Sequence, residues 1–63
     1  MKTLLPIGTT GTAAYDFITI NSLIKKGTRV TITGINPSRG YELTDEYGNC
    51  VSEMGFNSII PDN

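Results

Sequence analysis

The sequence has no histidine, no tryptophan and a single cysteine among its 63 residues. Without histidine, the chain lacks the side chain that most often serves as a general base or a zinc ligand near neutral pH. One cysteine cannot form an internal disulfide, and neither it nor the serines have a histidine to activate them as nucleophiles. The sequence therefore predicts no metal, no cofactor and no catalytic residue, so we expect a protein that is not an enzyme.

Long apolar runs are also absent. No segment approaches the ~18 consecutive apolar residues of a membrane-spanning helix. Residues 1–5 resemble the beginning of a signal peptide. Pro6 and Gly8, however, end the apolar stretch before it reaches the ~7–15 residues of a signal-peptide core. A lone cysteine without an export signal favours a reducing compartment. We therefore expect a cytoplasmic protein that makes no use of a membrane.

Charge of either sign is sparse. Five basic and six acidic residues give a formal net charge of −1, whereas nucleic-acid binding usually needs several clustered basic side chains. The nearest approach to such a cluster is a group of three, Lys25, Lys26 and Arg29. If these three side chains lie on one face of a barrel, they would contact the phosphate backbone of a single strand, and Tyr15 or Tyr47 would stack on its bases. Binding of single-stranded nucleic acid is therefore the second hypothesis for function.

The residues that are present favour strands and tight turns. Most apolar side chains are β-branched or aromatic, and seven glycines divide the chain into short segments. A chain of this length makes one domain, residues 1–63, in which residues 1–12 are either an arm or a first strand. Because closing a sheet removes its exposed edges, the pattern predicts an all-β fold, a small five-stranded and partly open β-barrel.

The strands follow from alternation between the turn signals. Residues 8–12 read as a flexible turn and residues 21–26 as either a short strand or a helical turn. Residues 56–60 read as a 3₁₀ turn or a last short strand. The remaining expected strands are 13–20, 28–35, 41–44 and 49–54.

Individual side chains can be placed within this plan. Val30 and Ile32 point to one face, and Gly34 marks a bulge that breaks their alternation. Tyr41 and Leu43 point inward on the next strand, and Cys50 faces the core as a small apolar residue on the strand after it. Residues 36–40 form a turn. Residues 45–48 form a tight hairpin loop, in which the aspartate accepts local backbone hydrogen bonds and the glycine takes a left-handed conformation.

Two segments carry a resemblance to a known family. Ala13-Ala14-Tyr15-Asp16-Phe17 resembles the Ala-Leu-Tyr-Asp-Tyr/Phe opening of SH3 domains, and Lys25-Lys26-Gly27 resembles their Lys-Lys-Gly-Asp segment. An aromatic-led strand at Tyr41, a hairpin at 45–48 and a closing Ser58-Ile59-Ile60 then follow in the order of that family. The resemblance implies an SH3-like barrel.

The departures from that family bear on function. The central tryptophan of the SH3 peptide groove has no counterpart, and Tyr41 sits near its place. The segment after Phe17 is short and apolar where the family has an acidic loop, and Asn57 replaces a proline before the closing strand. These differences argue against recognition of proline-rich peptides.

The leading hypothesis is a protein-binding module that acts on another protein without catalysis. Tyrosine and arginine are common anchors of protein interfaces, and loops are where binding residues concentrate. The candidate protein-binding residues are Arg39, Tyr41, Tyr47 and Tyr15. A free-standing chain of this kind would suit a bacterial, plasmid or phage accessory factor that modulates a larger protein. A third hypothesis is a structural homo-oligomer, in which an open edge strand from 1–7 or 13–20 pairs with a second copy.

Overall fold

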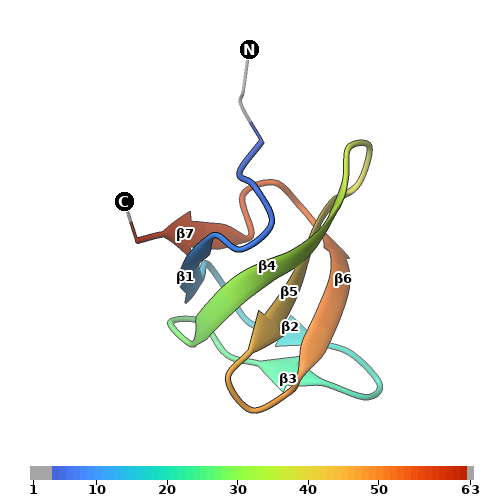
Figure 1. Ribbon diagram of the computed structural model, residues 1–63. Coiled ribbons are helices and arrows are strands. Elements are labelled where there is room, and N and C mark those ends of the chain that lie inside the picture. The colour runs from blue at the N-terminus through green and yellow to red at the C-terminus, as the bar shows by residue number, and fades with distance from the viewer. Residues whose placement is uncertain (1–3, 63) are drawn as a thin grey trace.

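The computed structural model describes residues 4–62, and over that range the chain is all β, as predicted (Figure 1). Five strands form one antiparallel sheet in the order β6-β5-β4-β1-β7, and β2 pairs with β3 in a separate two-stranded sheet. None of these residues forms a helix that could cross a membrane. The strands are β1 (Thr10–Ala13), β2 (Phe17–Ile18), β3 (Leu23–Ile24), β4 (Arg29–Asn36), β5 (Gly40–Asp45), β6 (Cys50–Met54) and β7 (Ile59–Pro61).

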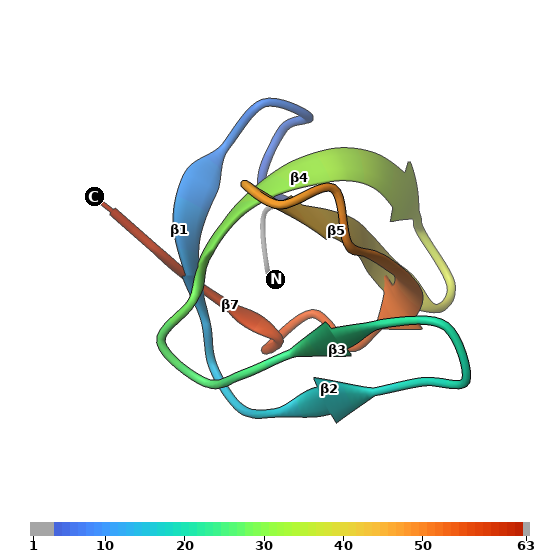
Figure 2. The ribbon, with the colours of Figure 1, turned by 90° about the horizontal axis from the view of Figure 1, so that it is seen from below.

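The five-stranded sheet curls around the interior without closing. Its two edges, β6 and β7, are not paired with each other within residues 4–62. Seen from below, β1, β4 and β5 arc around the interior, and the β2–β3 pair lies across the side that they leave open (Figure 2). The sheet is thus open, in agreement with the expectation of a partly open arrangement.

The meander β4–β5–β6 follows the predicted alternation closely. Val30 and Ile32 are buried from β4, and Tyr41 and Leu43 are buried from β5. The register of β4 against β5 shifts between Ile32 and Gly34, which confirms the predicted bulge. The core cluster gathers apolar side chains from all seven strands: Ala13, Phe17, Ile24, Val30, Ile32, Tyr41, Leu43, Val51 and Ile59.

The β5–β6 hairpin is held by Asp45. One carboxylate oxygen of this buried side chain accepts hydrogen bonds from the backbone N–H of Tyr47, at 2.9 Å, and of Asn49, at 2.8 Å. The other accepts from the amide nitrogen Nδ2 of Asn49 at 3.0 Å. Gly48 has a φ of 87°, in the left-handed region. The predicted turn chemistry is confirmed, because the aspartate satisfies N–H groups that the tight loop leaves without strand partners.

The prediction of a flexible turn over residues 8–12 is wrong. Residues 10–12 belong to β1, which lies between β4 and β7 in the sheet. The glycine-threonine sequence resembles a turn, but Gly11 lies where β1 and β7 approach each other closely. A Cβ there would overlap the backbone carbonyl of Ile60, so the glycine allows β7 to pack against β1.

Two further expectations need correction. A continuous strand over 13–20 is wrong, because the chain bends at 14–16 and only Phe17–Ile18 forms β2. Cys50 is exposed rather than in the core, since alternation along β6 turns the next residue, Val51, inward. Of the open alternatives, Leu23–Ile24 is a strand and the chain closes with the strand Ile59–Pro61. Residues 4–7 form no strand, and the start of the 1–7 segment lies outside the described residues.

Candidate protein-binding site

The segment 4–9, which we call the arm, lies over one end of the curled sheet (Figure 1). The backbone N–H of Gly8 donates to the carbonyl of Ile32 at 2.8 Å, and the N–H of Ile32 donates to the carbonyl of Thr9 at 2.9 Å. Nearer the start, the N–H of Leu5 donates to the hydroxyl of Tyr41 at 3.0 Å. These bonds to strands β4 and β5 hold the arm against the end of the sheet.

A cavity of about 580 Å³ opens between the arm and this end of the sheet. Its size falls in the usual range of ligand pockets, and the mouths of curled sheets are a common place for them. Within residues 4–62, its lining carries no charged side chain. We call this cavity the apolar mouth, and its lining residues are Leu4, Leu5, Pro37, Tyr41, Phe56, Ile59 and Pro61.

One wall of the apolar mouth is an aromatic pair. The rings of Tyr41 and Phe56 meet edge to face, with centroids 5.4 Å apart and an interplanar angle of 87°. Tyr41 is buried, whereas Phe56 is 36% exposed and Leu4, another lining residue, is 39% exposed. A ligand can therefore contact Phe56 and Leu4, while the buried ring of Tyr41 packs against Phe56. Such arrangements favour apolar side chains, because aromatic rings bury large areas at a fixed geometry.

Tyr15 lies beside the same turn that supplies Phe56. Its hydroxyl donates to Oδ1 of Asn57 at 2.8 Å, and its ring packs edge to face on Phe17 with centroids 5.1 Å apart. Because Asn57 directly follows Phe56, the same turn contacts Tyr15 through Asn57 and Tyr41 through Phe56. Of the four predicted protein-binding residues, Tyr41 thus belongs to the lining of the apolar mouth and Tyr15 contacts the turn that supplies Phe56.

The other two predicted residues, Arg39 and Tyr47, do not meet. Arg39 directly precedes β5 and Tyr47 follows its end, so the six residues of β5 separate them. At ~3.3 Å per strand residue, this separation is roughly 20 Å. Both side chains are exposed, and Arg39 forms an ion pair with Glu53 at 3.4 Å. A single small interface containing both residues is therefore not available on this surface.

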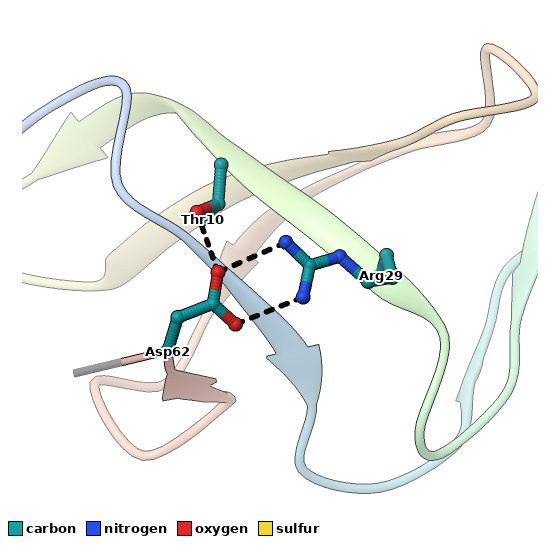
Figure 3. Close-up of polar contacts among 3 residues, drawn as sticks. All are labelled: Thr10, Arg29 and Asp62. Carbon is teal, nitrogen blue, oxygen red and sulfur yellow. Dashed lines mark hydrogen bonds and ion pairs between the residues drawn. The ribbon is translucent and has the colours of Figure 1, made fainter.

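The three predicted basic residues differ in their surroundings. Lys25 and Lys26 are exposed before β4, and within residues 4–62 neither forms an ion pair. Arg29 instead binds the carboxylate of Asp62 through both terminal nitrogens, each at 2.9 Å (Figure 3). The hydrogen bond and the charge of Asp62 raise the pKa of Arg29. One of the three positive charges is therefore neutralised within the chain.

Sequence reasoning misses most of the apolar mouth. Leu4 and Leu5 resemble the start of an incomplete signal segment, and Pro37 and Pro61 resemble simple turn residues. These residues come from both ends and the middle of the chain, so only the fold shows that they converge. A usable signal is present in the apolar and proline residues near both termini, since the two termini of a domain often lie close together.

Among residues 4–62, no three metal-ligating side chains lie close enough together to hold an ion. Comparison of the chain with protein-family models, with curated protein sequences and with solved structures found no match.

Proposed function

We propose that this chain is a non-enzymatic protein-binding module and that the apolar mouth receives apolar side chains from a peptide segment or loop of a partner protein. The observation that carries the proposal is the cavity itself. It measures about 580 Å³, its lining over the described residues 4–62 holds no charged side chain, and two of its lining residues, Phe56 and Leu4, are exposed to solvent. Desolvating such a lining on binding costs little, because it holds no charge to be stripped of water.

A peptide suits this site better than a small polar molecule. Among the lining residues that the structure describes, the one side-chain polar group is the hydroxyl of Tyr41, which already accepts a hydrogen bond from the N–H of Leu5. Polar small-molecule sites need several polar groups that converge on the ligand. An apolar anchor seated against an aromatic wall is instead typical of the energetic centre of a protein interface.

We also infer that the strand arrangement is that of an SH3-like small barrel. Support comes from Tyr41 near the start of β5, from the hairpin that follows β5, and from Ile59–Pro61 as the last strand. These elements occur in the order that the resemblance at Ala13–Phe17 implies. The binding site proposed here involves the arm and the end of the sheet, so it does not depend on the missing groove tryptophan.

A peptide library displayed on phage tests the proposal even though the partner is unidentified. We expect selection on the immobilised chain to enrich peptides with large apolar residues. Leu4→Asp should weaken binding of an enriched peptide by at least about tenfold, because it places a charge in the apolar lining. The matched control is Ile7→Asp, an exposed apolar residue on the same arm outside the lining. The proposal would be contradicted if both variants lost the same affinity for the peptide, or if neither variant lost any.

A further inference from the structure

The strand β7 is paired along one edge only. That edge pairs with β1, and over residues 4–62 no strand pairs with the other edge, which we call the free edge of β7. Figure 1 shows β7 next to β1 and below the arm. The free edge is therefore a row of main-chain groups that a second extended segment can use.

The hydrogen bonds of β1 show which main-chain groups face the free edge. Ala13 lies opposite Ile59 in the register. Its N–H donates to the carbonyl of Thr28 at 2.9 Å, and its carbonyl accepts from the N–H of Gly27 at 2.9 Å. Ala13 thus bonds away from β7, so the N–H and C=O of Ile59 point to the free edge. Pro61, two residues further on, points its carbonyl the same way but has no N–H to donate.

These main-chain groups lie at the apolar mouth, because Ile59 and Pro61 both belong to its lining. Ile59 is buried, and the pairing of β7 gives its N–H and C=O no partner among residues 4–62. An unpaired backbone group in such surroundings costs free energy. The lining therefore favours a ligand that brings complementary main-chain groups as well as apolar side chains.

The opposite edge of the sheet, β6, is less suited to strand addition. The register of β5 against β6 shifts between Tyr41 and Leu43, and Glu53 of β6 has a φ of 58°, in the left-handed region. A bulge of this kind twists an edge strand and interrupts its hydrogen-bond spacing. The carboxylate of Glu53 is also ion-paired with Arg39. The free edge of β7 is short and ends at Pro61, so it accepts one short segment rather than a growing sheet.

We propose that the partner segment binds as a short antiparallel strand along the free edge of β7, with alternate side chains in the apolar mouth. The inference rests on the proposed function, because it specifies the conformation of the segment that the apolar mouth receives. One partner residue exchanges two hydrogen bonds with Ile59, and the residue opposite Pro61 donates its N–H to the proline carbonyl. The antiparallel direction suits Ile59, because both of its groups then pair with a single partner residue.

The pairing determines which partner side chains enter the apolar mouth. Residues directly opposite each other in a sheet point to the same face. Ile59 belongs to the core cluster, whereas Ile60 is 56% exposed on the other face. The partner residues opposite Ile59 and Pro61 therefore point into the apolar mouth, and the residue between them points to solvent. We expect binding peptides to carry two large apolar residues separated by one residue of any type.

Methylation of single main-chain nitrogens in a synthetic peptide tests the strand pairing without altering the protein. The probe is a peptide selected from the phage library, and calorimetric titration measures its affinity. N-methylation of either apolar residue should weaken binding by at least about tenfold, because the methyl group replaces a proton that β7 accepts. N-methylation of the residue between them is the matched control and should change the affinity by less than about twofold. In the complex, we expect a nuclear Overhauser effect between the Ile59 amide proton and the peptide main chain.

Equal affinities of all three N-methylated peptides would overturn the strand pairing, and so would a complex in which the Ile59 amide contacts no peptide main chain. If the peptide in either case still loses affinity for Leu4→Asp but not for Ile7→Asp, the proposed function stands and the strand pairing alone fails. A library that enriches no peptide contradicts both. Contacts in the free protein between Ile59 and the main chain of a second, differently labelled copy would show that the edge pairs with itself, which also overturns the inference.

Discussion

Arg29 and Asp62 form a bidentate ion pair that joins the end of the chain to the middle of the sheet (Figure 3). Nη1 and Nη2 of the guanidinium lie 2.9 Å from Oδ1 and Oδ2 of the carboxylate, respectively. Oδ2 also accepts a hydrogen bond of 2.7 Å from the hydroxyl of Thr10. The three residues come from β4, from the position after β7, and from β1, so the pair holds β7 at the edge where it meets the rest of the sheet.

The ion pair predicts a specific dependence of stability on pH. The hydrogen bond from Arg29, followed by that from Thr10, lowers the pKa of Asp62 in the folded state. The stabilisation is therefore complete above the ordinary aspartate pKa of about 3.9 and is lost as the pH falls through the lower folded value. We expect Asp62→Asn to melt below the wild type at neutral pH, with a small difference because the pair is exposed to solvent.

Thermal melts of the wild type and Asp62→Asn at successive pH values between about 2 and 7 check this expectation. The difference in melting temperature should shrink to zero in acid and should also decrease at high salt. A difference that stays constant from neutral pH to acid would mean that the charge of Asp62 contributes nothing.

Asp45 should contribute more to stability than any of the exposed carboxylates. Burial raises its pKa, but the hydrogen bonds from Asn49, Tyr47 and Gly48 outweigh that effect and leave the pKa below the usual value. Asp45→Ala leaves several N–H groups of the hairpin without an acceptor, so we expect a loss of about 2 kcal/mol in the free energy of unfolding. Urea denaturation measures this loss, with the exposed neighbour Glu46→Ala as the control. Equal effects of the two substitutions would contradict the assigned role of Asp45.

Gly40 should be the least replaceable of the positive-φ glycines. Its φ is 130°, and a Cβ there would overlap the carbonyl oxygen of Met54. Gly48 has a φ of 87° but open space around its Cβ position. Gly48→Ala should therefore cost only the left-handed backbone strain, about 1–2 kcal/mol, whereas Gly40→Ala adds a steric overlap that forces β5 and β6 apart. A Gly40→Ala protein as stable as Gly48→Ala in urea would contradict this close approach.

The hydroxyl of Tyr41 should control the order of the arm. Tyr41→Phe keeps the ring against Phe56 but removes the acceptor for the N–H of Leu5. A net hydrogen-bond contribution of about 1 kcal/mol corresponds to amide exchange at Leu5 roughly fivefold faster. Hydrogen exchange followed by NMR measures the exchange rate of the Leu5 amide directly. The N–H of Gly8, which donates to Ile32, is the internal control and should be unchanged. Faster exchange at both amides would mean that the substitution loosens the whole arm.

The parts of the fold that are predictable from sequence are those with local determinants. Alternation over 28–54 indicates which residues of β4 and β5 are buried, and the bulge at Gly34 and the hairpin at Asp45 follow from the chemistry of single residues. The first strand is missed because Gly11 reads as a turn residue, and its real role depends on the backbone of Ile60, far away in sequence. Local patterns carry no information about such an approach of distant strands.

The candidate site is less accessible to sequence reasoning than the fold. Residue type alone selects Tyr15 and Tyr41 as interface residues, and both lie at or beside the apolar mouth. The same reasoning selects Arg39 and Tyr47, yet β5 places them at opposite ends of a strand. Residue type thus indicates which side chains suit an interface, whereas the grouping of such residues is a property of the topology.

An NMR titration of the ¹⁵N-labelled chain with a library-selected peptide tests the central claim most directly. If the apolar mouth is the binding site, the amide shifts will concentrate at Leu4, Leu5, Tyr41, Phe56 and Ile59, and Leu4→Asp will abolish them while Ile7→Asp leaves them unchanged. Shifts concentrated instead around Tyr47, around Lys25 and Lys26, or spread evenly over the sheet would contradict the apolar mouth as the site of protein binding.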